Sequence, residues 1–214
     1  MPAGQHHRSA ASRQLPALNT PAALIECGLL YFLAPLWLLA GAADFACHRV
    51  LHIEYSAGVR ESLLHLLMLA QLAVAVLCAL LLEPTALVFA IMLAACLAHE
   101  ATTCADLAYA EKRRRIPWFE QWVHALQQSF PWAWLAGWML VHSPQALAFI
   151  GLGEAAPVWE LRLRQPPLPM TYLVAFCAGA ALLIVAPFTY ELWRCVRAGK
   201  SARPPGAATI APGT

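Results

Sequence analysis

Three pairs of an acidic residue and a histidine, each four positions apart, are the side chains of this sequence best placed to do chemistry. The pairs are Asp44 and His48, Glu61 and His65, and Glu120 and His124. A spacing of four puts both members of a pair on one face of a helix. Carboxylates and imidazoles that project inward from several helices are the ligands of di-iron and di-manganese bundles. The pattern therefore predicts a metal site that several helices build together.

A further group of polar residues, His99, Thr103 and Asp106, lies in another apolar stretch. An α-helix rises about 1.5 Å per residue, so the number of residues from the far end of each helix gives the depth of a side chain. The carboxylates of the three pairs and of Asp106 then fall at one depth, and His65 and His124 lie about one turn deeper. Four carboxylates in one layer would repel one another unless cations neutralise them. We expect bound metal ions to supply that positive charge.

Five apolar segments must position these residues. They run from about residue 22 to 48, from 61 to 82, from 85 to 110, from 119 to 142 and from 168 to 193. Each has the roughly 20 residues that a helix needs to cross a bilayer. We expect a kink at Pro35, and helix ends at Glu83-Pro84 and Ser143-Pro144, because proline lacks a backbone donor. The last segment has no histidine or aspartate, and we expect it to support the bundle.

The composition is typical of a membrane protein. Of the 214 residues, 60% are hydrophobic and 12% are charged, and the mean hydropathy is +0.58. Soluble domains are about half apolar and about a quarter charged. A net charge of +2 gives no basic surface for nucleic acid, so we exclude that partner. The seven cysteines are odd in number and form no CxxC motif, which argues against a disulfide framework.

These observations predict an all-α polytopic membrane protein with about five transmembrane helices in residues 20–200. An antiparallel four-helix bundle would hold the polar site at its cytoplasmic end. Residues 1–19 lack the apolar core of a signal peptide, and we expect them, like residues 201–214, to form a flexible tail.

Lysine and arginine in the loops predict the orientation of the chain, since cytoplasmic loops are enriched in these residues. Ten basic residues fall on one side: Arg49, Arg60, Lys112, Arg113, Arg114, Arg115, Arg194, Arg197, Lys200 and Arg203. Four fall on the other: Arg8, Arg13, Arg162 and Arg164. We therefore place the N-terminus outside and the C-terminus in the cytoplasm, in a bacterial inner membrane. We interpret Arg113–Arg115 as headgroup anchors.

Eight residues are the expected metal ligands: Asp44, His48, Glu61, His65, His99, Asp106, Glu120 and His124. Weaker candidates are His52, Glu54 and Glu100, and Thr103 would line an oxygen or substrate pocket. Oxygen and nitrogen ligands without thiolate favour two iron ions, with zinc or manganese as alternatives. The ExxxH spacing differs from the ExxH of ferritin-like proteins. The helices also lack the adjacent histidines of membrane desaturases and hydroxylases, so neither family provides a substrate.

A metal site of this kind inside a bilayer indicates an O2-dependent oxidoreductase, a hydroxylase or desaturase of an apolar, lipid-like substrate. Its partners would be membrane lipids, the substrate and a soluble electron donor. One alternative is a membrane zinc hydrolase, which needs fewer ligands than the eight candidates. Another is a non-enzymatic protein that binds haem or conducts ions or protons. Conduction is disfavoured because the outer halves of the second and third segments are almost free of polar residues.

Overall fold

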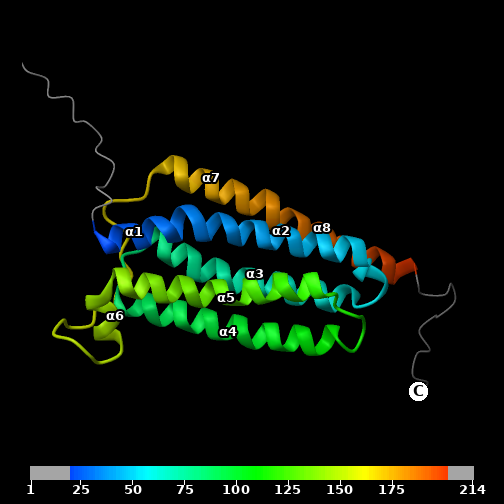
Figure 1. The fold of residues 1–214 in the computed structure, drawn as a ribbon, viewed down its shortest axis with the longest axis horizontal. Coiled ribbons are helices and arrows are strands. Elements are labelled where there is room, and N and C mark those ends of the chain that lie inside the picture. Colours follow the sequence, from blue (N-terminus) through cyan, green and yellow to red (C-terminus); the bar gives the residue numbers. More distant parts are fainter. Residues whose placement is uncertain (1–19, 202–214) are drawn as a thin grey trace, which may run out of the picture.

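The computed structural model describes residues 20–201, which are mostly helical, with a long non-helical connection over residues 150–169 (Figure 1). The helices are α1 (Pro21–Gly28), η1 (Leu29–Leu33), α2 (Ala34–Leu51), η2 (Ile53–Tyr55), α3 (Gly58–Leu81), α4 (Ala86–Ala110), α5 (Trp118–Val141), α6 (Ser143–Phe149), α7 (Met170–Ala180), η3 (Ala181–Val185) and α8 (Ala186–Ser201). The two expected tails lie outside the described residues, apart from Ser201 at the end of α8. All seven cysteines are free, as expected.

Two of the long helices contain a π-helical turn close to a proline. The elements α1, η1 and α2 form one helix, and η1 ends two residues before Pro35. In the same way η3 joins α7 to α8 and ends two residues before Pro187. A π-turn moves the hydrogen bonds by one residue, so the helix continues past a residue without a backbone donor. The disruption expected at Pro35 is therefore a π-turn, and the first helix continues to Leu51.

Four helices of the described chain are long and apolar enough to cross a membrane. They are Pro21–Leu51, Gly58–Leu81, Ala86–Ala110 and Met170–Gly199. This confirms an all-helical, integral membrane protein. The fourth predicted segment forms α5, which is of similar length but is not among these four helices. Ser143 and Pro144 end this segment as expected, but they also begin α6, a short helix that the sequence did not indicate.

The long helices surround a common interior. Helix α3 packs along α4, α4 against α5, and α5 against α1 and α2. The last helix closes the arrangement, because α7 and η3 lie against α2 while α8 lies against α3 and η2 (Figure 1). The interior is apolar at the end near α6, where Phe89, Leu80 and Trp138 are at most 2% exposed. At the opposite end, near η2, it is polar.

Candidate metal centre

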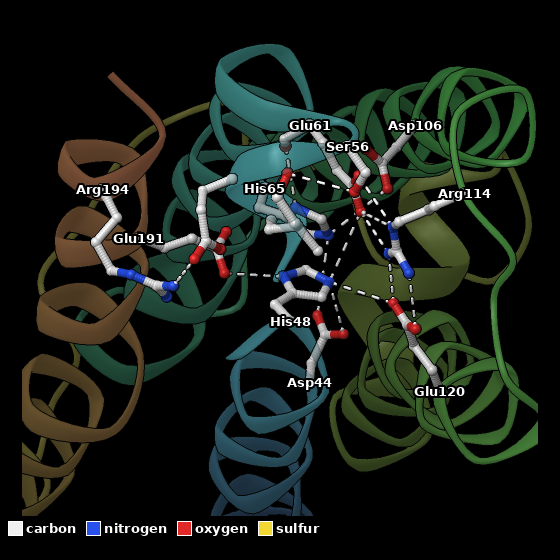
Figure 2. A network of polar contacts seen from close by, with 12 residues as sticks. Asp44, His48, Ser56, Glu61, His65, Asp106, Arg114, Glu120, Glu191 and Arg194 are labelled. Carbon is white, nitrogen blue, oxygen red and sulfur yellow. Dashed lines mark hydrogen bonds and ion pairs between the residues drawn. The ribbon is translucent and has the colours of Figure 1, made fainter. Parts of the chain in front are cut away.

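The three acid–histidine pairs meet at the polar end of the bundle. Figure 2 shows Asp44, His48, Glu61, His65 and Glu120 of these pairs. This end holds the last turns of α2 and α4 and the first turns of α3 and α5. Asp44, His48, Glu61 and Glu120 are each at most 1% exposed. Successive helices run in opposite directions, so a pair late in one helix faces a pair early in the next. The sequence pattern thus places its polar residues together in space.

Four ligand atoms converge on one point. Asp44, His48, His65 and His124 each offer one atom, and these atoms all lie within 4.8 Å of one another. The Oδ1 of Asp44 is 3.0 Å from Nε2 of His124 and 3.4 Å from Nε2 of His48. The Nε2 of His65 is 3.9 Å from Oδ2 of Asp44. Ligands about 2.1 Å from a tetrahedral ion lie roughly 3.4 Å apart. We call these four residues the compact set.

Hydrogen bonds fix the orientation of two of the imidazoles. The Nδ1 of His48 is 3.0 Å from Oε2 of Glu191, and Nδ1 of His65 is 3.0 Å from the backbone oxygen of Glu61. Because a carboxylate and a carbonyl oxygen accept hydrogen bonds, both contacts favour a proton on Nδ1, and in the neutral imidazole the lone pair of Nε2 then faces the compact set. The Nε2 of His48 is buried and makes no hydrogen bond within residues 20–201. Buried polar atoms are rarely left in this state, and a metal ion would satisfy it.

Two other carboxylates are held by an arginine. Nη2 of Arg114 is 2.5 Å from Oε1 of Glu61 and 2.5 Å from Oε1 of Glu120. Further bonds from Nη1 and Nε make both contacts bidentate. Burial acts to lower the pKa of Arg114, but the bonds to Glu120 and Glu61 raise that pKa above its usual range, so the guanidinium stays charged.

The interpretation of Arg114 as a headgroup anchor is therefore wrong. Its side chain is only 6% exposed and bridges α3 and α5 across the polar end. It supplies one of the positive charges that the sequence pattern assigned to metal ions. Arg114 thus offsets part of the charge of the two glutamates that it contacts, whereas Asp44 and Asp106 form no ion pair with an arginine or lysine within residues 20–201. Glu120 still borders the compact set, with Oε1 3.4 Å from Nε2 of His48.

Asp106 and His99 lie beside the compact set. Oδ2 of Asp106 is 3.6 Å from Nε2 of His65, and its buried Oδ1 has no hydrogen-bond partner among the described residues. His99 is seven residues before Asp106, roughly 10 Å along α4. It is not one of the four convergent ligands, although it lines the same cavity.

This cavity has a volume of about 70 Å³. One water molecule needs about 10–15 Å³ measured in this way, so there is room for an ion with small ligands. Asp44, His65, Asp106 and His124 line it, and so does Thr103, the residue expected at an oxygen or substrate pocket. Phe188, which is 4% exposed, stacks on His65 from α8, with ring centroids 5.5 Å apart.

The weaker candidates lie elsewhere. His52, with 68% of its side chain exposed, contacts Glu54, and Glu54 forms an ion pair with Arg194. Glu100 accepts hydrogen bonds from Gln128 and Trp132. The structure thus gives all three side chains partners outside the compact set.

Two residues of the centre were missed by the sequence reasoning. Glu191 is 1% exposed and orients His48 from α8, the helix expected to be support only. A signal existed, because Glu191 is the one acidic residue in the last apolar segment and ionisable groups at membrane depth mark functional sites. Arg114 had no such signal, since Arg113 and Arg115 are its direct neighbours.

No family model matches the chain, and no curated protein or solved structure shows significant similarity to it. The function must therefore be inferred from the site itself.

Proposed function

We propose that this protein is a membrane-bound, metal-dependent oxidoreductase, a hydroxylase or desaturase of an apolar, lipid-like substrate. The observation that supports it best is the compact set, three imidazoles and one carboxylate aimed at one buried point. A set of histidines with one carboxylate and open positions is typical of non-haem iron sites that use O2. The adjoining cavity offers space for O2 and substrate next to those ligands.

We propose iron as the metal. The first ion would be bound by Asp44, His48, His65 and His124. The second of the two expected ions would take a ligand from Asp106, which lies beside His65, while His99 lines the same cavity about two turns along α4. Glu61 and Glu120 would act mainly through Arg114, which holds them at the rim of the site.

In the proposed hydroxylation, O2 and a C–H bond react with two electrons and two protons to give C–OH and water. The bound iron would supply the redox chemistry. The electrons would come from a soluble one-electron carrier at the cytoplasmic face. The chain itself would orient the ligands through Glu191 and the backbone of Glu61, and would exclude water with Phe188.

We also propose that α5 is the fifth membrane span and that an antiparallel four-helix bundle, α2 to α5, holds the site. The N-terminus would be outside and the C-terminus in the cytoplasm of a bacterial inner membrane. The basic residues that support this orientation lie near η2, between α4 and α5, and in α8. The site would then lie close to the cytoplasmic electron donor.

Metal analysis of detergent-purified protein tests the proposal. We expect about two irons per chain by plasma mass spectrometry, with no Soret band in the absorption spectrum. His124→Ala should lose the metal, because it removes one of four convergent ligands. His142→Ala is the matched control, since His142 follows the opposite end of the same helix. A Soret band would indicate haem, and a folded protein without metal would refute the proposal.

A zinc hydrolase is the second candidate, and one observation favours it. Any three residues of the compact set would suffice for a catalytic zinc ion, which keeps its fourth position for water, and a further carboxylate, Asp106, lies beside the set as a base. One zinc and no iron per chain in the same measurement would select this candidate.

A further inference from the structure

A second cavity adjoins the polar one, deeper in the bundle. It has a volume of about 30 Å³ and shares two lining residues, Trp37 and Leu72, with the polar cavity. Its other walls include Ala75, Met92 and Phe130, and no charged residue of the described chain lines it. We call it the apolar slot. The lining thus changes along the bundle, from the ionisable residues of the polar cavity to the hydrophobic residues of the apolar slot.

The depth of the slot follows from the helices that line it. Trp134, at its far end, lies ten residues after His124 in α5, and Ala34 lies ten residues before Asp44 in α2. At about 1.5 Å per residue both distances are roughly 15 Å. Beyond this depth Trp138 and Phe89 are fully buried and close the interior. The slot therefore lies between the polar cavity, with which it shares Trp37 and Leu72, and the buried residues Trp138 and Phe89.

We propose that the apolar slot binds the methyl end of an unbranched hydrocarbon chain of the substrate. The headgroup would point back through the polar cavity, so that an internal carbon of the chain lies beside Asp44 and His65. This inference rests on the proposed function and specifies its substrate class. The depth of the slot would then fix which carbon reacts, counted from the methyl end.

Three properties favour this occupant over others. A polar group would lack a hydrogen-bond partner in the slot and would be costly to bury, whereas methylene groups gain by leaving water. The volume of about 30 Å³ is small, and we expect it to admit a thin chain but not a ring, a branched chain or two chains side by side. Met92 in the wall is flexible and can move to admit a thin chain.

Photolabelling tests the proposal. The probe is an unbranched fatty acid with a diazirine at its terminal carbon, added to the purified full-length protein and mapped by mass spectrometry. We expect label on Ala75, Met92 or Phe130, and competition by the unlabelled straight-chain acid but not by a branched one. Ala75→Phe should reduce this label by about tenfold, because its ring fills the slot. Val74→Phe is the matched control, since Val74 is the neighbouring residue and is 46% exposed.

Several outcomes would overturn the proposal. Label confined to lipid-facing residues such as Val74 or Leu182 would do so, as would full labelling of Ala75→Phe. If Ala75→Phe does not fold, Ala75→Val serves as a smaller plug and should give a smaller, measurable loss. Metal content of the same samples separates the two hypotheses. Labelling of the slot in protein that contains no metal would refute the oxidoreductase proposal alone. Metal-containing protein without label in the slot would refute the substrate proposal alone.

Discussion

Replacing Arg114 with methionine should destabilise the protein by about 5 kcal/mol. The side chain of Arg114 is 6% exposed, and it hydrogen-bonds to two carboxylates, of Glu61 and Glu120, that are fully buried. Removing one partner of a buried ion pair typically costs about 3–5 kcal/mol. Here one substitution leaves two carboxylates without their cation, so we expect the upper end of that range. For a protein of this size the thermal midpoint should fall by roughly 10–20 °C.

Thermal unfolding in detergent, followed by the intrinsic tryptophan fluorescence, measures this effect. Arg113→Met is the matched control. Arg113 is the adjacent residue, and it contacts Tyr109 at the exposed surface, so its loss should cost less than about 1 kcal/mol. Arg114→Lys should be intermediate, because lysine keeps the charge but cannot form two bidentate contacts. Adding Glu61→Gln and Glu120→Gln to Arg114→Met should restore part of the stability, since amides carry no charge.

Equal midpoints for Arg114→Met and Arg113→Met would refute the reasoning, since they would mean that Arg114 does not bridge the two carboxylates. Failure of the glutamine substitutions to restore any stability would also count against it. In that case the loss would come from packing and not from unpaired charge.

Two further predictions concern the carboxylates of Glu191, which contacts His48, and of Glu54, which pairs with Arg194. Glu191→Gln should lower metal affinity by about 10–100-fold with little change in fold, because the amide is a weaker acceptor for the Nδ1–H of His48; equilibrium competition with a chelator measures this, and unchanged affinity would contradict it. At Glu54, burial opposes ionisation, but the pKa is lowered by a backbone hydrogen bond and by Arg194. The folded pKa lies below the unfolded value of about 4.5, so the advantage of wild type over Glu54→Gln should be present above that pH and lost as the pH falls further. Unfolding midpoints of both proteins across acidic pH test this, and a difference that does not depend on pH would argue against the ion pair.

Much of the helical fold could be predicted from local patterns. The length of each apolar run and the positions of the prolines predict both ends of each long helix to within a few residues, apart from the C-terminal end of the last one. These ends are predictable because they depend on residues that are close together in the sequence. The π-turn before Pro35 was not foreseen, since it depends on how the chain rearranges its own hydrogen bonds. α5 was grouped with the spans by its length, yet its residues are less apolar than those of the other long helices.

The site could be predicted where periodicity alone determines it. Asp44 and His48 share a helical face, and antiparallel packing then brings the other two pairs to the same place. The position of His99 along the helix is harder to predict. His99 is seven residues before Asp106, so it lies on the same face of α4 but about two turns away from the compact set. Arg114 depends on the conformation of a short loop, and no periodic pattern distinguishes it from its neighbours.

The position of Glu191 in the last long helix has a consequence for biosynthesis. The imidazole of His48 gains its orienting partner only when α8 has inserted and docked beside α3 and η2. Before α8 is synthesised, α2, α3, α4 and α5 are already complete. Their polar ends can then meet only without the carboxylate of Glu191. A nascent chain truncated before α8 therefore contains every residue of the compact set but lacks its finished geometry. The contact between His48 and Glu191 can therefore form only after almost the whole protein has been translated.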